Sequence, residues 1–122
     1  MPAVPRVLVL EDEPLIAVMM RDWLTELGCE TVGPAQTVPS ALALIENGPL
    51  DGAILDVSIG NQDSSAAADA LRSRGIPFAF ATGRTGDGLA ARYPDAPSLS
   101  KPYDFAALRG VVAGLLGTPA QP

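Results

Sequence analysis

The feature that most constrains the fold is the alternation of short, unbroken apolar runs with segments of helical periodicity. The runs cover residues 6–10, 52–55, 76–81 and, more weakly, 98–100. Such runs are typical of strands that are covered on both faces, as in a parallel sheet. A weaker run at residues 30–33 is expected at an edge of the sheet. The alternation predicts a doubly wound α/β fold of five strands and up to five helices, because parallel neighbours are joined by right-handed crossovers through helices.

The segments between these runs predict the helices. The first helix is expected to begin at Pro14 and to end before Gly28, and others are expected at 40–47, 64–74 and 104–116. Segment 83–93 carries three glycines within six residues, each costing about 1 kcal/mol of helix propensity relative to alanine, so any helix there should be short and mobile. The residues expected to face the core are Ile16, Met20, Trp23, Leu24, Leu27, Leu42, Ile45, Phe105, Leu108, Val112 and Leu115.

Length and composition predict the class of protein. The 122 residues are expected to form one domain, with a core at about 6–116 and a loose tail at 117–122. No apolar run is long enough to cross a bilayer and the first residues do not resemble a signal peptide, so a cytoplasmic protein without membrane contact is expected. The net charge of −6, with only eight scattered Lys and Arg, argues against a nucleic-acid partner.

The rare residue types narrow the chemistry further. The chain has no histidine, which excludes Ser-His-Asp and Cys-His nucleophiles, imidazole metal sites and phosphohistidine. The single cysteine, Cys29, cannot form an internal disulfide and is expected to pack in the core. Any reaction must therefore use carboxylates, hydroxyls or a lysine.

Polar side chains of this kind follow the predicted strands. In doubly wound sheets ligands bind outside the carboxyl ends of the strands. Glu11 and Asp12 follow the first predicted strand, Asp56 the third, Thr82 the fourth and Lys101 the fifth. Crowded carboxylates repel one another unless a cation lies between them, and Mg²⁺ prefers such oxygen ligands.

This arrangement predicts phosphoryl transfer to a carboxylate. We expect Asp12 and Asp56 to bind Mg²⁺ directly, Glu11 to act through water and the backbone carbonyl of Ser58 to complete the site. Asp56 beside the cation can attack a phosphoryl group and form an aspartyl phosphate. Lys101 and the Thr82 hydroxyl would stabilise the phosphoryl oxygens. Each residue taken singly has an ordinary explanation, such as a turn, a strand end or a solvated charge, and the specificity comes from their combination.

Four segments resemble the receiver domain of bacterial two-component response regulators over about residues 6–116. They are Val7-Leu-Val-Leu-Glu-Asp-Glu-Pro14, Ala53-Ile-Leu-Asp-Val57, Phe80-Ala-Thr-Gly83 and Lys101-Pro102. The resemblance implies a flavodoxin-like, CheY-like sheet in strand order 2-1-3-4-5. The third segment also resembles a group of single-domain receivers in alphaproteobacteria, although Arg84 and Thr85 depart from the fuller pattern of that group.

The resemblance also implies roles for the candidate residues. Glu11 and Asp12 correspond to the acidic pair, Asp56 to the phosphoacceptor, Thr82 to the switch hydroxyl and Lys101 to the phosphate-binding lysine. The bond before Pro102 is expected to be cis, as in the family.

One position departs from the family pattern. Receivers usually place an aromatic residue three positions before the lysine, where it follows the movement of the switch hydroxyl, and Ser98 stands there in this chain. We therefore expect the glycine-rich segment after Thr82 to rearrange instead. Side chains two residues beyond Asp56 and Thr82, here Ser58 and Arg84, lie where the family tunes dephosphorylation.

The implied partners are a sensor histidine kinase and a downstream protein target or phosphotransfer protein. The chain is expected to be a monomer or weak homodimer and to be no enzyme beyond its own phosphorylation and dephosphorylation. Two output modes stay open: docking onto a target, or service as a relay or phosphate sink. Three other classes of protein would leave different marks in the sequence. A phosphate-ester hydrolase would have a second acid where Ser58 stands, a phosphate-independent pseudo-receiver would lack some of the site residues, and a nucleotide-binding protein would carry a Gly-rich fingerprint after the first strand.

Overall fold

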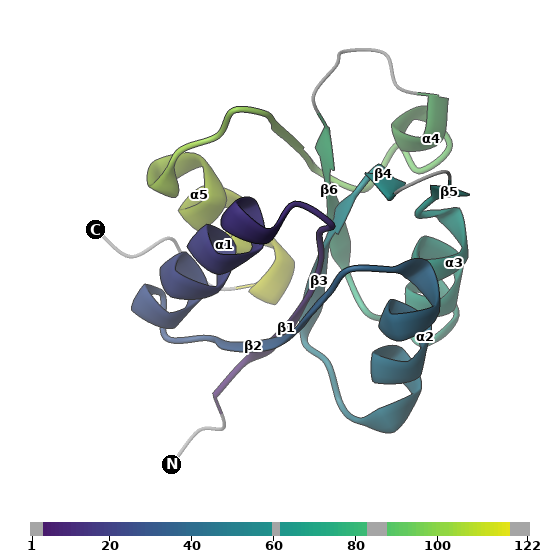
Figure 1. Cartoon of the computed structure of the whole chain (residues 1–122), viewed down its shortest axis with the longest axis horizontal. Coiled ribbons are helices and arrows are strands. Elements are labelled where there is room, and N and C mark those ends of the chain that lie inside the picture. Colours follow the sequence, from purple (N-terminus) through teal and green to yellow (C-terminus); the bar gives the residue numbers. More distant parts are fainter. Residues whose placement is uncertain (1–3, 60–61, 83–87, 118–122) are drawn as a thin grey trace.

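The central feature of the structure is one five-stranded parallel sheet (Figure 1). The computed structural model describes residues 4–59, 62–82 and 88–117. The strands lie in the order β2-β1-β3-β6-β7. Counted along the chain within this sheet, that order is 2-1-3-4-5, so the predicted topology is confirmed. The strands are β1 (Arg6–Leu10), β2 (Glu30–Ala35), β3 (Gly52–Asp56), β6 (Phe78–Thr82) and β7 (Ser98–Ser100).

Helices cover both faces of the sheet (Figure 1). One face is covered by α1 (Pro14–Glu26) and α5 (Phe105–Leu116). The other is covered by α2 (Val38–Asn47), α3 (Ser65–Ser73) and the short α4 (Gly88–Ala91). This is the doubly wound arrangement that alternating strands and helices predict.

The sheet separates two buried cores because successive strand residues point to opposite faces. In β1, Val7 and Val9 join the core beneath α1 and α5, whereas Leu8 and Leu10 join the core beneath α2 and α3. Cys29 is buried and free in the first of these cores, as a packing role requires. Among the described residues, no helix combines the length and apolar character needed to span a membrane.

Local signals set the helix ends. Pro14 occupies the first turn of α1, and Gly28 takes the left-handed conformation with φ +83° just beyond that helix. The Asp104 carboxylate accepts a hydrogen bond of 2.8 Å from the Ala107 N–H and caps α5. The predicted start of the second helix was two residues late, because the Thr37 side chain accepts from the Ser40 N–H and moves the cap forward.

Other predictions need correction. A two-stranded antiparallel hairpin, β4 (Ser58–Ile59) with β5 (Gln62–Asp63), was not predicted, because two residues show no readable periodicity. The run at 76–81 forms a strand only from Phe78, and Thr82 is its last residue rather than its successor. Edge strand β2 extends to Ala35, beyond the predicted 30–33.

The predicted helix faces hold in part. Met20, Leu24, Ile45, Leu108 and Val112 are buried. The remaining expected core residues lie at the margins of the core and are half-buried: Ile16, Trp23, Leu27, Leu42, Phe105 and Leu115.

Two further predictions fall partly outside the described residues. The predicted mobile, rearranging segment includes 83–87, with Arg84, and the predicted tail includes 118–122; both stretches lie outside the description. In the described part of segment 83–93, helix α4 is four residues long, so the prediction of a short helix is confirmed.

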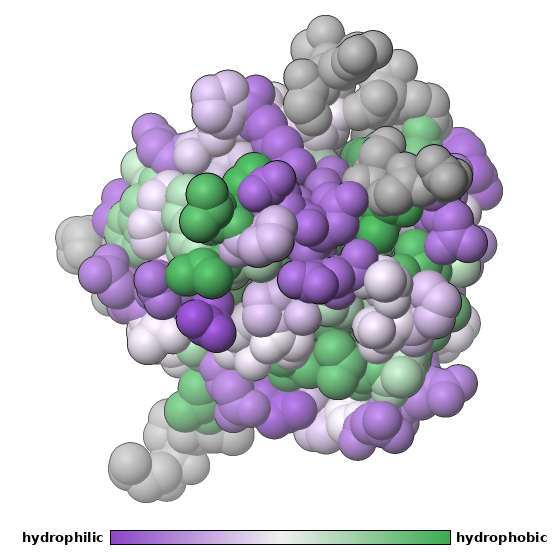
Figure 2. All heavy atoms as spheres, viewed as in Figure 1, coloured by the Kyte–Doolittle hydropathy of each residue, from purple (hydrophilic) through white to green (hydrophobic). Residues whose placement is uncertain are grey.

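The surface over α1 carries exposed hydrophobic side chains next to a hydrophilic area at the end of β1 (Figure 2). Leu15 and Val18 of α1 are among these exposed residues, whereas Leu24 of the same helix is fully buried. One helix thus contains both extremes of burial for the same residue type.

Leu24→Ala is expected to lower the free energy of unfolding by about 2–5 kcal/mol, because it removes transfer free energy and leaves a cavity. Leu15→Ala is the matched control, since Leu15 is 79% exposed, and is expected to change stability by about 0.5 kcal/mol or less. Urea unfolding followed by circular dichroism measures both. Equal losses in the two variants would contradict the burial described for α1.

Candidate functional site

The candidate residues meet at the carboxyl edge of the sheet. Glu11 follows β1 directly, Asp56 ends β3, Thr82 ends β6 and Lys101 follows β7. Strands β1, β3, β6 and β7 are neighbours in that order and run parallel, so their carboxyl ends lie side by side. The edge predicted from the sequence is therefore the place where these groups converge.

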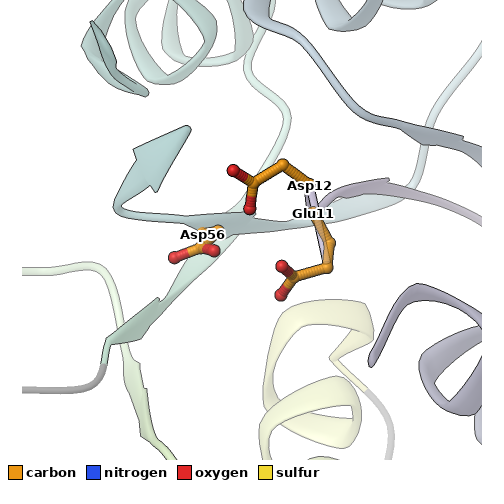
Figure 3. Close-up of side chains that lie close together, drawn as sticks. All are labelled: Glu11, Asp12 and Asp56. Carbon is orange, nitrogen blue, oxygen red and sulfur yellow. The ribbon is translucent and has the colours of Figure 1, made fainter. Parts of the chain in front are cut away.

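Three carboxylates form the floor of the site (Figure 3). Glu11 and Asp12 come from the end of β1 and lie beside Asp56 of β3, with one oxygen of each within 4.8 Å of the others. Glu11 is buried, with 2% of its surface exposed, whereas Asp12 is exposed and Asp56 is half-buried. The cluster thus runs from the core to solvent.

Lys101 supplies the positive charge that faces this cluster. Its Nζ lies 3.0 Å from Asp56 Oδ2 and 3.3 Å from Glu11 Oε1. Burial lowers the pKa of Lys101, but its hydrogen bond to Asp56 and the charges of Asp56 and Glu11 outweigh burial and hold that pKa above its usual value. The ammonium therefore stays charged and bridges two carboxylates from different strands.

Glu11 is fixed by three hydrogen bonds. Its carboxylate accepts from the Glu13 N–H at 2.9 Å and from Lys101, and its own N–H donates to the Ala35 carbonyl at 2.9 Å. Burial, followed by repulsion from Asp56, raises the pKa of Glu11, although the Glu13 N–H and Lys101 act in the opposite direction. An ionised Glu11 is costly here, and a cation beside it would lower that cost.

Backbone contacts connect the lysine with the strand that carries the hydroxyl. The Lys101 N–H donates to the Thr82 carbonyl at 2.8 Å, and the Thr82 residue is 8% exposed. The Lys101–Pro102 bond is cis, so that prediction is confirmed. Ser58 lies in β4, two residues beyond Asp56, and the role of its carbonyl stays a prediction.

Tyr103 is a site neighbour that the sequence reasoning did not single out. Its hydroxyl is buried and has no hydrogen-bond partner, and its ring packs edge-on against Trp23 of α1 at 6.4 Å between centroids. Burial, then the negative charges of Glu11 and Asp56, raises the pKa of Tyr103 well above its usual range. The only available signal was its place two residues after Lys101.

The donor set suits a hard divalent cation. Mg²⁺ binds carboxylate oxygens, retains several waters and is usually held by one or two carboxylates together with phosphate. Glu11, Asp12 and Asp56 supply such oxygens, and the exposed side of the cluster at Asp12 leaves room for water. These residues therefore fit a Mg²⁺ ion, with a lysine placed to contact an anion bound at Asp56.

Comparisons of the sequence and of the structure with known proteins indicate the same family. A family model described as the response regulator receiver domain matches residues 7–113. The solution structure of SdrG from Sphingomonas melonis Fr1 is 44% identical, with 95% of this chain and 99% of that chain covered and a TM-score of 0.83. A second SdrG structure, in a BeF3-activated conformation, gives a TM-score of 0.79. The identity to SdrG is consistent with the alphaproteobacterial type that the Phe80-Ala-Thr-Gly83 segment resembles.

Two curated relatives are longer proteins. PdtaR from Mycobacterium tuberculosis, a transcriptional regulatory protein, is 35% identical over 111 residues, which cover 87% of this chain and 54% of PdtaR. PhyR from Methylorubrum extorquens, a phyllosphere-induced regulator, is 29% identical over 114 residues, which cover 90% of this chain and 43% of PhyR. The chain therefore spans about half the length of these relatives.

The tyrosines provide a test of the site's electrostatics. Tyr103 is expected to titrate above the usual value of about 10, and Asp56→Asn is expected to lower its pKa because one nearby negative charge is lost. The measurement is ultraviolet absorbance of tyrosinate in a Tyr93→Phe background, where Tyr103 is the one remaining tyrosine. Asp95→Asn, the same change at an exposed acid that does not act on Tyr103, is the control.

The sign of the linked stability change follows from the same shift. A group whose pKa is higher in the folded than in the unfolded chain adds stability below its unfolded pKa of about 10 and loses it as the pH rises through the folded value. The free energy of unfolding is therefore expected to fall as the pH rises above about 10. Titration near pH 10 in the still-folded protein would contradict the environment described for Tyr103.

Proposed function

We propose that this chain, which belongs to the response regulator receiver domain family, accepts a phosphoryl group on Asp56 and signals through contacts with other proteins. The observation that carries the proposal is the Lys101 ammonium, which is hydrogen-bonded to Asp56 and Glu11 at the edge where three carboxylates meet. A surface role alone does not explain why a buried acid and a half-buried acid from different strands share one lysine.

The reaction needs an ionised Asp56. One Asp56 oxygen attacks the phosphorus and forms the new P–O bond, while the bond from phosphorus to the donor breaks and its electron pair leaves with the donor. The donor is the imidazole nitrogen of a phosphohistidine in a sensor kinase, or the carboxylate oxygen of a small acyl phosphate. Lys101 then pairs with a phosphoryl oxygen, and the Thr82 hydroxyl donates to another.

The acids would hold the metal ion. We assign Asp12 and Asp56 as direct Mg²⁺ ligands, Glu11 as a ligand through water and the Ser58 carbonyl as the remaining protein oxygen. When bound, Mg²⁺ supplies positive charge that neutralises phosphoryl oxygens. Glu11 and Asp12 keep that charge beside Asp56, and Lys101 faces the same carboxylate as a second cation.

The partners follow from the family and from the charge of the chain. We infer a sensor histidine kinase as phosphoryl donor and a downstream protein target or phosphotransfer protein as receiver of the signal. PdtaR is a transcriptional regulatory protein and a PhyR from Bartonella quintana is an anti-anti-sigma factor, so relatives of this domain serve gene regulation. With a net charge of −6, this chain is proposed to act there through protein contacts, in the cytoplasm, and not by binding nucleic acid.

Phosphorylation by acetyl phosphate tests the acceptor. Wild type is expected to gain one phosphoryl group by intact mass with Mg²⁺ and none in EDTA, and Asp56→Asn is expected to gain none. Asp22→Asn on α1, the same substitution at an exposed acid outside the cluster, should behave as wild type.

The alternative functions make different predictions in this experiment. No gain by wild type, under conditions that phosphorylate a control receiver, would favour a phosphate-independent binding module. Phosphate on Asp56→Asn would mean that another residue is the acceptor. Sustained multiple turnover of the phosphate ester would favour a hydrolase.

Mg²⁺ binding is testable without phosphorylation. At a free Mg²⁺ concentration of about 100 times Kd, wild type is expected to gain about 2.7 kcal/mol in free energy of unfolding. Asp12→Asn removes one carboxylate of the cluster and should lose most of this gain at the same concentration, whereas Asp22→Asn should retain it. Urea unfolding with and without Mg²⁺ measures the difference. An equal gain in Asp12→Asn would exclude Asp12 as a ligand.

A further inference from the structure

Position 98 lacks the aromatic residue that receivers usually carry there. Ser98 in β7 is exposed and lies opposite Phe80 of β6 in the parallel pairing. Five positions earlier, in the turn after α4, Tyr93 is buried with 5% of its surface exposed. The large Tyr93 side chain is therefore buried near position 98. Receivers usually carry an aromatic residue at that position, and this chain has only the small side chain of Ser98.

Tyr93 makes two kinds of contact there. Its ring packs against Phe78 and Phe80, with centroids 5.6 Å away in both cases. Its hydroxyl donates a hydrogen bond to the Asp69 carboxylate of α3. Burial, together with this bond, raises the pKa of Tyr93, so the phenol is a permanent donor at neutral pH. Tyr93 thus connects the turn after α4 with both β6 and α3.

The contacts with β6 lead toward the phosphoacceptor site. Phe78, Phe80 and Thr82 alternate along β6 and therefore point to the same face of the sheet. The two phenylalanine rings contact each other edge-on at 5.5 Å, and Thr82 is the next residue of this row. Tyr93 packs on the first two members, and Leu89 of α4 is buried in the same core.

The turn after α4 is held down at more than one point. The Arg72 guanidinium of α3 lies 5.2 Å from the Tyr93 ring centroid and 5.5 Å from that of Phe78, and it pairs with Asp95 at 3.0 Å. This pair is exposed and contributes little to stability. The Tyr93–Asp69 bond differs because its donor is buried.

The Lys101 ammonium is hydrogen-bonded to the carboxylate of Asp56, the proposed phosphoacceptor. Pairing of Thr82 with a phosphoryl oxygen would displace the last residue of the β6 row. A close-packed core answers such a displacement by repacking between discrete arrangements, because it has no free volume to absorb it. The large side chains nearest to Thr82 along this row are Phe80 and then Tyr93, which packs on it.

We propose that Tyr93 is the positioning residue that couples Thr82 to α4, and that its hydrogen bond to Asp69 holds the unphosphorylated arrangement. The inference rests on the proposed function of Asp56. Phosphorylation breaks the Tyr93–Asp69 bond as Thr82, Phe80 and Tyr93 move together. Asp69 is exposed and regains water as its partner, so the exchange is reversible.

The test measures the affinity for beryllofluoride with Mg²⁺, the phosphoryl analogue in the activated structure of SdrG. Tyr93→Phe keeps the ring and removes only the hydroxyl. Because the lost bond stabilises one state alone, the variant is expected to bind beryllofluoride about tenfold more tightly than wild type. Trp23, the single tryptophan, gives the fluorescence signal, since its ring contacts Tyr103 beside the site.

Two further variants separate coupling from a merely structural role. Asp69→Asn is expected to tighten binding in the same direction, and the Tyr93→Phe, Asp69→Asn double variant to add nothing to Tyr93→Phe, because both act on one bond. Asp95→Asn is the matched control, with the same loss of charge on the partner of Arg72, and should bind as wild type.

The outcomes are distinguishable. Wild-type affinity in Tyr93→Phe, or weaker binding with lowered stability, would overturn the coupling while wild-type binding upholds the proposed function. Independent, additive effects of the two single variants would also overturn it. Absence of binding by wild type itself would overturn the proposed function and the inference together.

Discussion

The structure depends on one electrostatic constraint: three carboxylates converge at the edge of a parallel sheet and one ammonium offsets them. Parallel β1 and β3 bring Glu11, Asp12 and Asp56 together whatever their mutual repulsion. Lys101 counters that repulsion through two hydrogen bonds, and the N–H of Lys101 is itself held by the Thr82 carbonyl of β6. The lysine is therefore fixed to the sheet at its backbone and to the acids at its tip. The site lies at the edge of the sheet, which borders both of its faces.

The two faces have different relations to the site. On the α1 and α5 side, Tyr103 and Trp23 pack beneath the acids, and the raised pKa of Tyr103 reports their charge. On the α2, α3 and α4 side, the Phe78 and Phe80 rings run along β6 to Thr82. If Asp56 is phosphorylated as proposed, the added charge would act electrostatically on the core beneath α1 and sterically on the core beneath α3 and α4. The conformational response that we propose therefore lies on the side of α4.

The features that could be predicted from the sequence are those that depend on hydrophobic periodicity and on where the strands end. Apolar runs indicated the strands, and the polar residues at or just after their carboxyl ends indicated the site, because parallel strands bring their carboxyl ends to one edge. Hairpin β4–β5 was not predicted, since strands of two residues show no hydrophobic periodicity. The start of α2 was predicted too late, since Thr37 is as good an N-cap residue as Ser40. Tyr93 and Tyr103 were missed for another reason: their neighbours Asp69 and Trp23 are distant in sequence, so no local pattern indicates these contacts.

In the proposed function, the phosphoryl oxygens and the Glu11 carboxylate compete for the hydrogen bonds that Lys101 donates. A phosphoryl group would add nearly one further negative charge at Asp56 and three acceptor oxygens, so Lys101 would turn toward it and away from Glu11. Glu11, which is 2% exposed, then loses a donor that burial makes costly to lose. A cation held by Glu11 and Asp12 would offset that loss more strongly in the phosphorylated than in the unphosphorylated chain. Because such coupling is reciprocal, we expect metal affinity and phosphoryl-analogue affinity each to rise when the other ligand is bound, by the same factor.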